Sequence, residues 1–183
     1  MSSGTIGDIL QAHRAGASPA ETIARTYARI REHDDPAIFI TLRDEKEVIA
    51  EAKALSAKGD TSLPLYGVPF AVKDNIDVGG MPTTAGCPAF AYTAKADATC
   101  VARLRAAGAI VIGKTNLDQF ATGLVGVRSP YGIPRMRSTQ NLSPADRAQA
   151  RLSRSRPAWC RSRSAATRPA PAAFRQASAI SLG

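Results

Sequence analysis

An α/β fold, with a mixed sheet flanked by helices, is predicted by three features of the sequence. Short apolar runs typical of buried strands occur at residues 68–72 and 109–116. Amphipathic stretches of helical length lie before, between and after these runs. Helix-capping residues and glycines lie between these stretches, where the predicted helices should begin and end. Strand, helix, strand in this order is typical of chains that build parallel strand pairs with a crossover helix.

The first third of the chain predicts two helices and a strand. Residues 5–14 favour a short helix. The next helix begins with Ser18 as N-cap, Pro19 at the first position and Glu21 at the third, a capping-box pattern. Ile23, Tyr27 and Ile30 fall on one face of that helix and should pack against the core. The apolar stretch at 36–42 predicts a strand.

The middle of the chain supplies the rest of the predicted fold. Residues 43–59 favour a helix that ends at Gly59, and residues 96–108 favour another that ends at Gly108. Val68–Val72 predicts a buried strand that runs directly into Lys73, Asp74 and Asn75. The strand at 109–116 is followed by a short helix, Leu117–Thr122, where Asp118 and Gln119 should serve as capping or packing residues.

The net charge of +9 is distributed very unevenly. Residues 136–183 carry +8 and residues 1–135 only +1. Arg, Ser, Ala and Pro make up 32 of the last 48 residues, without helical or strand periodicity. We therefore divide the chain into a folded part, 1–135, and a basic tail, 136–183, that we expect to be disordered.

Several classes of protein receive no support. No run of residues approaches the length of a transmembrane helix, and the amino terminus lacks the apolar segment of a secretory signal. Cys87, Cys100 and Cys160 are widely spaced, as is typical of reduced thiols, and favour a cytoplasmic protein. Cys87 is interpreted as a buried loop thiol because no histidine is placed to activate it. His13 and His33 lie in predicted helices and indicate no metal site.

Lys73 is the residue whose position indicates chemistry. A lysine at a strand end can simply point into solvent. Here, however, a buried strand carries Lys73 to its tip, where α/β proteins place their sites. Asp74 and Asn75 follow at once and could orient its amine. Both interpretations remain open on the residues alone.

A family resemblance decides between them. The stretches "LPLYGVPFAVKDNIDVGGMPTTAGCPAF" and "DATCVARLRAAGAIVIGKTNLDQFATG" resemble the amino-terminal part of an amidase-signature hydrolase. "DQFATGLVGVRSPYG" and the earlier "DDPAIFI" resemble allophanate hydrolase more than other members. The resemblance is strong over residues 36–135. It implies an incomplete, amino-terminal part of that fold.

The resemblance also implies a mechanism. Lys73 matches the catalytic lysine of a Ser–cis-Ser–Lys triad that cleaves amide C–N bonds without a cofactor or metal. The implied substrate is a small urea-derived amide, allophanate. Arg128 and Tyr131 are candidates to contact this small anion. Family members are often oligomers, which we do not expect of a fragment, and no membrane or specific nucleic acid partner is expected.

Both serine motifs of the triad are missing from the 183 residues. A codon test suggests where they are. Reading "PADRAQAR" (144–151) one base out of register allows Gly-Gly-Ser-Ser-Ser-Gly-Ser, and "ATRPAP" (166–171) allows Asp-Thr-Ala-Gly-Ser. We interpret residues 136–183 as an out-of-frame translation and expect the chain to be inactive.

The alternative is a small basic protein that binds nucleic acid or another anionic surface. "SRSRPAWCRSRS" resembles an Arg-Ser segment with one aromatic residue available for stacking. In that interpretation the tail is functional and genuinely encoded. GC-rich codons read out of register also produce Arg, Ser, Ala and Pro, so composition alone does not separate the two interpretations.

Overall fold

The computed structural model describes residues 5–123 and 126–135, and the predicted basic tail lies outside them. In chain order the longer elements are α1 (Ile6–Arg14), α2 (Pro19–His33), β1 (Phe39–Leu42), α3 (Glu45–Ala57), β2 (Pro69–Lys73), α4 (Thr99–Ala106) and β5 (Ile110–Thr115). Between β2 and α4 lie β3 (Pro82–Thr83), the 3-10 turn η1 (Pro88–Phe90) and β4 (Tyr92–Thr93). A second 3-10 turn, η2 (Gln119–Ala121), follows β5. The predicted α/β class is confirmed.

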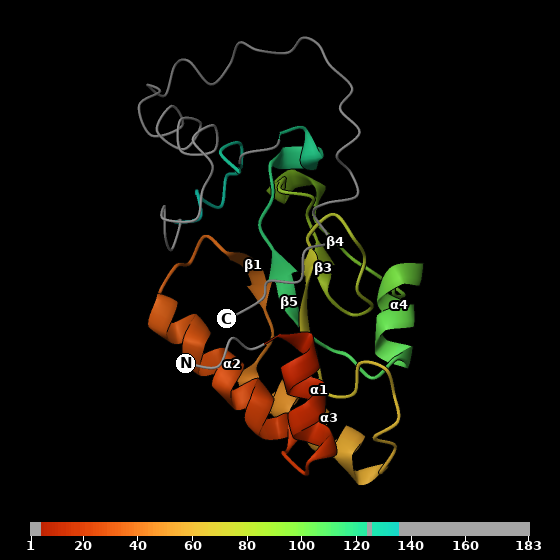
Figure 1. Ribbon diagram of the computed structural model, residues 1–183. Helices are drawn as coiled ribbons and strands as arrows, with labels where there is room; N and C mark the ends of the chain where they lie inside the picture. The colour runs from red at the N-terminus through yellow and green to blue at the C-terminus, as the bar shows by residue number, and fades with distance from the viewer. Residues whose placement is uncertain (1–4, 124–125, 136–183) are drawn as a thin grey trace.

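A three-stranded mixed sheet forms the centre of the fold (Figure 1), with β5 between β1 and β2. β2 runs parallel to β5, and Lys73 pairs with Thr115 at its end. β1 runs antiparallel to β5. The connection from β2 to β5 passes through α4, which is the crossover that a parallel pair requires.

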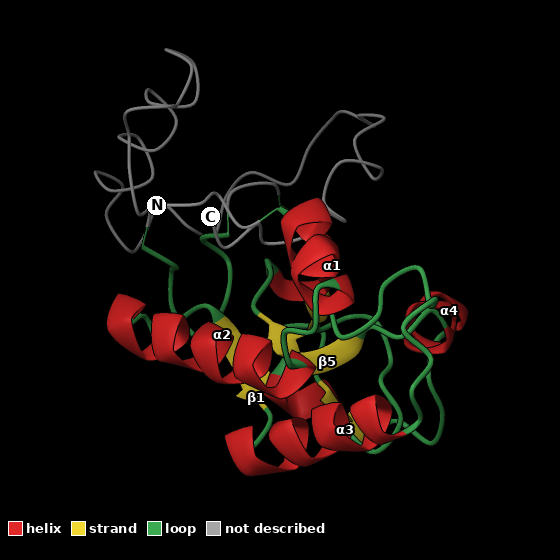
Figure 2. Cartoon of the chain, turned by 60° about the horizontal axis from the view of Figure 1, so that its bottom comes forward, coloured by secondary structure: helices red, strands yellow, loops and turns green. Residues whose placement is uncertain are grey.

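Helices lie on both faces of the sheet. α2 and α3 lie side by side on one face (Figure 2), and α4 lies on the other. The α2–α3 face buries a cluster that includes Ile23, Tyr27, Val48 and Ile112. The α4 face buries Val72, Val78, Met81, Val101 and Val111. Burial of these apolar surfaces is the main force that holds the helices on the sheet.

The predicted start of α2 is partly wrong. Ser18 is the N-cap and Pro19 the first helical residue, but the Ser18 side chain accepts from the Ala20 N–H at 3.2 Å. The Glu21 N–H instead donates to the backbone oxygen of Ser18. The reciprocal capping box lies at α1, where Thr5 and Asp8 bond each other's backbone N–H.

The helix predicted at Leu117–Thr122 is also wrong. Only a single 3-10 turn forms there, and Phe120 and Ala121 have positive φ angles, +49° and +56°. The reason is Asp118, which is buried and accepts hydrogen bonds from the backbone of a following loop and not from the first turn of a helix.

Close packing of β1 on β5 requires glycine at position 113. A Cβ atom there would lie 2.6 Å from the Thr41 backbone oxygen and 3.1 Å from Leu42 Cα. We expect Gly113→Ala to lower the free energy of unfolding by about 3 kcal/mol, because strand backbone cannot yield as a side chain does. Urea denaturation measures this change.

Gly7 in α1 is the matched control, since a Cβ there meets only Thr5 Oγ1, at 3.6 Å. Gly7→Ala should be neutral or stabilising by up to about 1 kcal/mol, as helix propensity predicts. Equal effects at the two glycines would contradict the packing argument.

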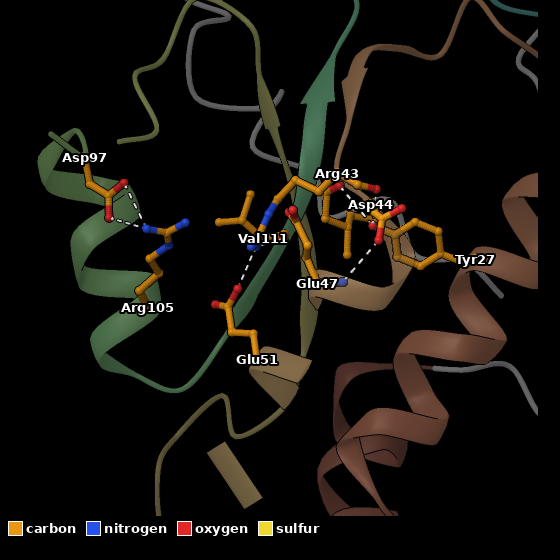
Figure 3. A network of polar contacts seen from close by, with 9 residues as sticks. Tyr27, Arg43, Asp44, Glu47, Glu51, Asp97, Arg105 and Val111 are labelled. Carbon is orange, nitrogen blue, oxygen red and sulfur yellow. Dashed lines mark hydrogen bonds and ion pairs between the residues drawn. The ribbon is translucent and has the colours of Figure 1, made fainter. Parts of the chain in front are cut away.

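The buried Tyr27 side chain joins α2 to the sheet (Figure 3). Its hydroxyl donates to the Arg43 backbone oxygen at 2.9 Å. Burial raises the pKa of Tyr27 to about 12. An unfolded chain ionises this phenol near pH 10. The stabilising effect is therefore complete below about pH 10 and is lost as the pH rises towards 12.

Tyr27→Phe should remove this pH dependence. We expect the wild-type chain to lose about 2 kcal/mol more stability than the variant between pH 9 and pH 12, measured by urea denaturation. Tyr131→Phe is the control and should keep the wild-type difference. A Tyr27→Phe chain with an unchanged alkaline profile would show that this phenol ionises equally in both states.

Candidate functional site

Lys73 is the last residue of β2, as the sequence predicted, and its side chain is half-buried. The parallel pairing with β5 brings the loops that follow both strands to the same edge of the sheet. The Asp74 N–H continues the ladder by donating to the Thr115 backbone oxygen at 3.1 Å. Lys73 thus stands at an edge where two chain segments leave the sheet together, as ligand sites do in α/β proteins.

Strand alternation separates Lys73 from the residues on either side of it. Val72 pairs with Lys114 and contributes to the cluster beneath α4. Ala71 packs against the α2–α3 cluster. Because successive side chains point to opposite faces, Lys73 lies on the α2–α3 side and Asp74 on the α4 side.

A buried ion pair lies directly behind Lys73. Lys114 Nζ and Asp74 Oδ1 are 3.3 Å apart, and both side chains have no exposed surface. Lys114 Nζ also donates to the Pro82 backbone oxygen at 3.1 Å and to Thr83 Oγ1 at 3.0 Å. Asp74 Oδ2 accepts from the Thr84 N–H at 2.8 Å and from the Thr84 hydroxyl at 2.6 Å.

This pair supplies a residue that the sequence reasoning missed. The Asp74 carboxylate is bound to Lys114 and Thr84, and its role in orienting the Lys73 amine stays a prediction. Lys114 is not among the site residues that the sequence predicted. The available signal was a lysine inside the apolar run "AIVIGKTN", because a buried cation must have a partner. Asn75 is exposed.

The loop after β2 is tied together by Asp77. Its Oδ1 accepts from the Thr83 hydroxyl and from the Tyr92 hydroxyl, both at 2.8 Å. The hydrogen bond to this carboxylate, with smaller contributions from desolvation and charge, raises the pKa of Tyr92. This loop also includes β3, which pairs with β4. Cys87 is the N-cap residue before η1 and is only half-buried, contrary to the prediction of a buried thiol.

Asn116 and Asp118 organise the segment that follows β5. Asn116 Nδ2 donates to the Ala37 and Gly132 backbone oxygens at 2.8 and 3.1 Å. Its Oδ1 accepts from Ser129 Oγ, whose oxygen in turn accepts from the Tyr131 N–H at 3.2 Å. Asp118 accepts from the Gly126 N–H at 2.9 Å and the Arg128 N–H at 2.7 Å.

These contacts place the two candidate substrate-binding residues. Tyr131 is half-buried and tied through Ser129 to the residue that follows β5, which leaves the sheet beside Lys73. Arg128 is exposed, and its guanidinium donates to the Thr122 backbone oxygen at 2.9 Å. Both belong to the segment that leaves the same edge, and their role as substrate contacts stays a prediction.

A shallow groove of about 420 Å³ lies elsewhere, between α3, α4 and the start of β5. Its arginines are already paired (Figure 3). Arg43 donates to Glu51 at 2.7 Å and to the Val111 backbone oxygen at 2.8 Å, and Arg105 donates to Asp97.

Within residues 5–123 and 126–135 no three His, Cys, Asp or Glu side chains are close enough to hold a metal ion. None of the described helices is long and apolar enough to cross a membrane.

The fold is that of an amidase. The sequence profile of the family described as Amidase matches residues 21–144, and the chain belongs to that family. It is 64% identical to the urea amidolyase of Lachancea kluyveri over 100 residues, which are 54% of this chain and 5% of the relative. It is 59% identical to the urea amidolyase of Saccharomyces cerevisiae over 95 residues, which are 51% of this chain and 5% of the relative.

A solved structure gives the same result. The allophanate hydrolase of Kluyveromyces lactis superposes with a TM-score of 0.59 at 42% identity, over 70% of this chain and 22% of that protein. The predicted resemblance to allophanate hydrolase and the predicted fold are therefore confirmed. The chain spans less than a quarter of the length of these relatives.

Asp118 offers a test of how the segment after β5 is held. Asp118→Ala leaves the Gly126 and Arg128 N–H groups without their acceptor, so we expect their amide hydrogen exchange to accelerate at least about tenfold. Asp118→Asn keeps one carbonyl oxygen and should accelerate exchange less. Amide exchange followed by NMR measures both, with the Val111 amide in β5 as internal reference. Unchanged exchange in Asp118→Ala would mean that other groups hold this loop.

Proposed function

We propose that the gene for this chain specifies a hydrolase of allophanate or a closely related small urea-derived amide, with Lys73 as the base. The observation that carries the proposal is the position of Lys73. Lys73 is the last residue of the parallel strand β2, and it lies at the edge of the sheet where the loops after β2 and β5 begin. Family membership and 64% identity to a urea amidolyase support this assignment.

The proposed chemistry is acyl transfer through two serines whose motifs are missing from the 183 residues. A neutral Lys73 Nζ takes a proton from a bridging serine, which takes one from the nucleophilic serine. The nucleophile bonds to the amide carbon, the C–N bond breaks, and the released nitrogen leaves as ammonia with the transferred proton. Water then hydrolyses the serine ester, and the N-carboxylated carbamate that is released takes up protons and breaks down to a second ammonia and two molecules of carbon dioxide.

The chain itself is proposed to be inactive. A Gly-Gly-Ser-Ser-Ser-Gly-Ser loop and an Asp-Thr-Ala-Gly-Ser turn do not occur in its 183 residues, although one shifted reading frame allows both. Without a nucleophile no acyl-enzyme forms, and little more than background hydrolysis is expected. Cofactor-free chemistry, a cytoplasmic location and a monomeric state are part of the same proposal.

Surface features of the described part support an incomplete domain. β1 and β2 are both edge strands of the three-stranded sheet. Phe90, Tyr92 and Phe120 form an aromatic cluster near the Lys73 edge, each 44 to 51% exposed, with ring centroids 5.3 and 5.6 Å apart. Exposed strand edges and aromatic clusters are surfaces that a complete domain covers.

The nucleotide sequence tests this proposal directly. We expect the shifted frame after codon 135 to encode both serine motifs. The restored chain should hydrolyse allophanate, the 183-residue chain should not, and Lys73→Met in the restored chain should lower kcat/KM at least about 10³-fold. Ammonia release under substrate excess is the measurement, and Lys95→Met, at an exposed lysine, is the control.

Two results would contradict the proposal. Turnover by the restored chain that survives Lys73→Met would remove Lys73 from the site. A shifted frame without the serine motifs would instead leave the tail as genuinely encoded, and the basic binding protein would become the better interpretation.

A further inference from the structure

The buried pair Asp74–Lys114 is not explained by stability alone. Removing two charges from water costs several kcal/mol per ion, and an apolar pair of similar volume is often at least as stable. Both side chains have no exposed surface. Asp74 Oδ1 accepts no hydrogen bond among the described residues, so the attraction to Lys114 at 3.3 Å is its only compensation.

The pair joins three segments of chain behind Lys73. Asp74 immediately follows Lys73, Lys114 lies in β5, and their remaining partners lie in the β3 turn at residues 82–84. An apolar pair could fill the same space but would supply none of these directional contacts. Lys114 Nζ donates two hydrogen bonds, to Pro82 O and Thr83 Oγ1, and its charge lies 3.3 Å from Asp74 Oδ1.

Asp74 is held at its backbone as well as its side chain. Its N–H donates to the Thr115 backbone oxygen at 3.1 Å, and its backbone oxygen accepts from the Ala85 N–H at 3.4 Å. Thr84 binds its carboxylate twice. With the residue after Lys73 fixed in this way, the pleat of the strand fixes the opposite face as the direction of the Lys73 side chain.

We propose that Asp74 and Lys114 are positioning residues for Lys73. Their ion pair holds the end of β2 against β5 and the β3 turn, so that the Lys73 amine leaves the sheet on the α2–α3 side in one direction. Lys114 is then a structural cation and not a second base. This proposal rests on the proposed function in one respect: a fixed direction of the Lys73 amine matters for the reaction only if Lys73 is the base.

The test measures the chemistry of the Lys73 amine in the 183-residue chain, without turnover. The chain has six lysines, so acetylation by trace acetic anhydride can be followed at each one by mass spectrometry. The variants are Asp74→Asn, Lys114→Met and the two together. The double variant removes both charges and keeps an amide oxygen to accept from the Thr84 N–H.

We expect each single variant to lower the thermal midpoint, because it leaves one buried charge without its partner. The double variant should recover much of that loss. Its Lys73 acetylation rate should nevertheless differ at least about threefold from wild type, with a displaced pH profile, while the exposed Lys46 and Lys95 are unchanged. Glu45→Gln is the matched control, since it breaks the exposed pair with Arg31 and should leave Lys73 unaffected.

A folded double variant with the wild-type Lys73 profile would overturn the proposal and make the pair purely structural. Should the double variant not fold, Thr84→Val decides the question. It removes one hydroxyl contact to Asp74 Oδ2 and should displace the Lys73 profile less, in the same direction. An unchanged profile there also overturns the proposal. Because acetylation requires no catalysis, this result is independent of whether restored chains hydrolyse allophanate.

Discussion

The parallel pairing of β2 with β5 is the constraint on which the rest of the structure depends. It sets Lys73 opposite Thr115 and brings the loops after both strands to one edge. It also requires a crossover, which α4 supplies, and it buries both faces of the strands. The two apolar clusters, one beneath α2 and α3 and one beneath α4, therefore follow from this pairing.

Buried polar side chains fix the loops that leave the sheet. Asp74 and Lys114 connect the strand ends to the β3 turn, and Asn116 and Asp118 shape the chain beyond β5. Each of these side chains bonds backbone or hydroxyl groups of a loop. The candidate site thus owes its shape to buried polar residues, whereas the helices owe their positions to apolar burial.

In this chain, the residues that specify the amidase fold are distinct from the residues that would complete the proposed catalytic triad. Residues 21–144 carry the family profile, and the position of Lys73 fits the proposed base. The motifs of the proposed serine partners are missing from the 183 residues. Membership of the amidase family is therefore compatible with the proposal that this chain is inactive, and the proposed activity is assigned to the gene and not to this product.

The sequence by itself determined the class of fold, most of the helices and strands, and Lys73 as the candidate base. Apolar periodicity, Ser18, Gly59 and Gly108 are local signals, and local signals persist whatever the rest of the chain does. Tertiary structure alone decided the partners of Asp74, Lys114 and Asp118. The Asp74 carboxylate has Lys73 and Asn75 as neighbours in sequence, but its partner is 40 positions away, because strand pairing decides which charges share a buried face.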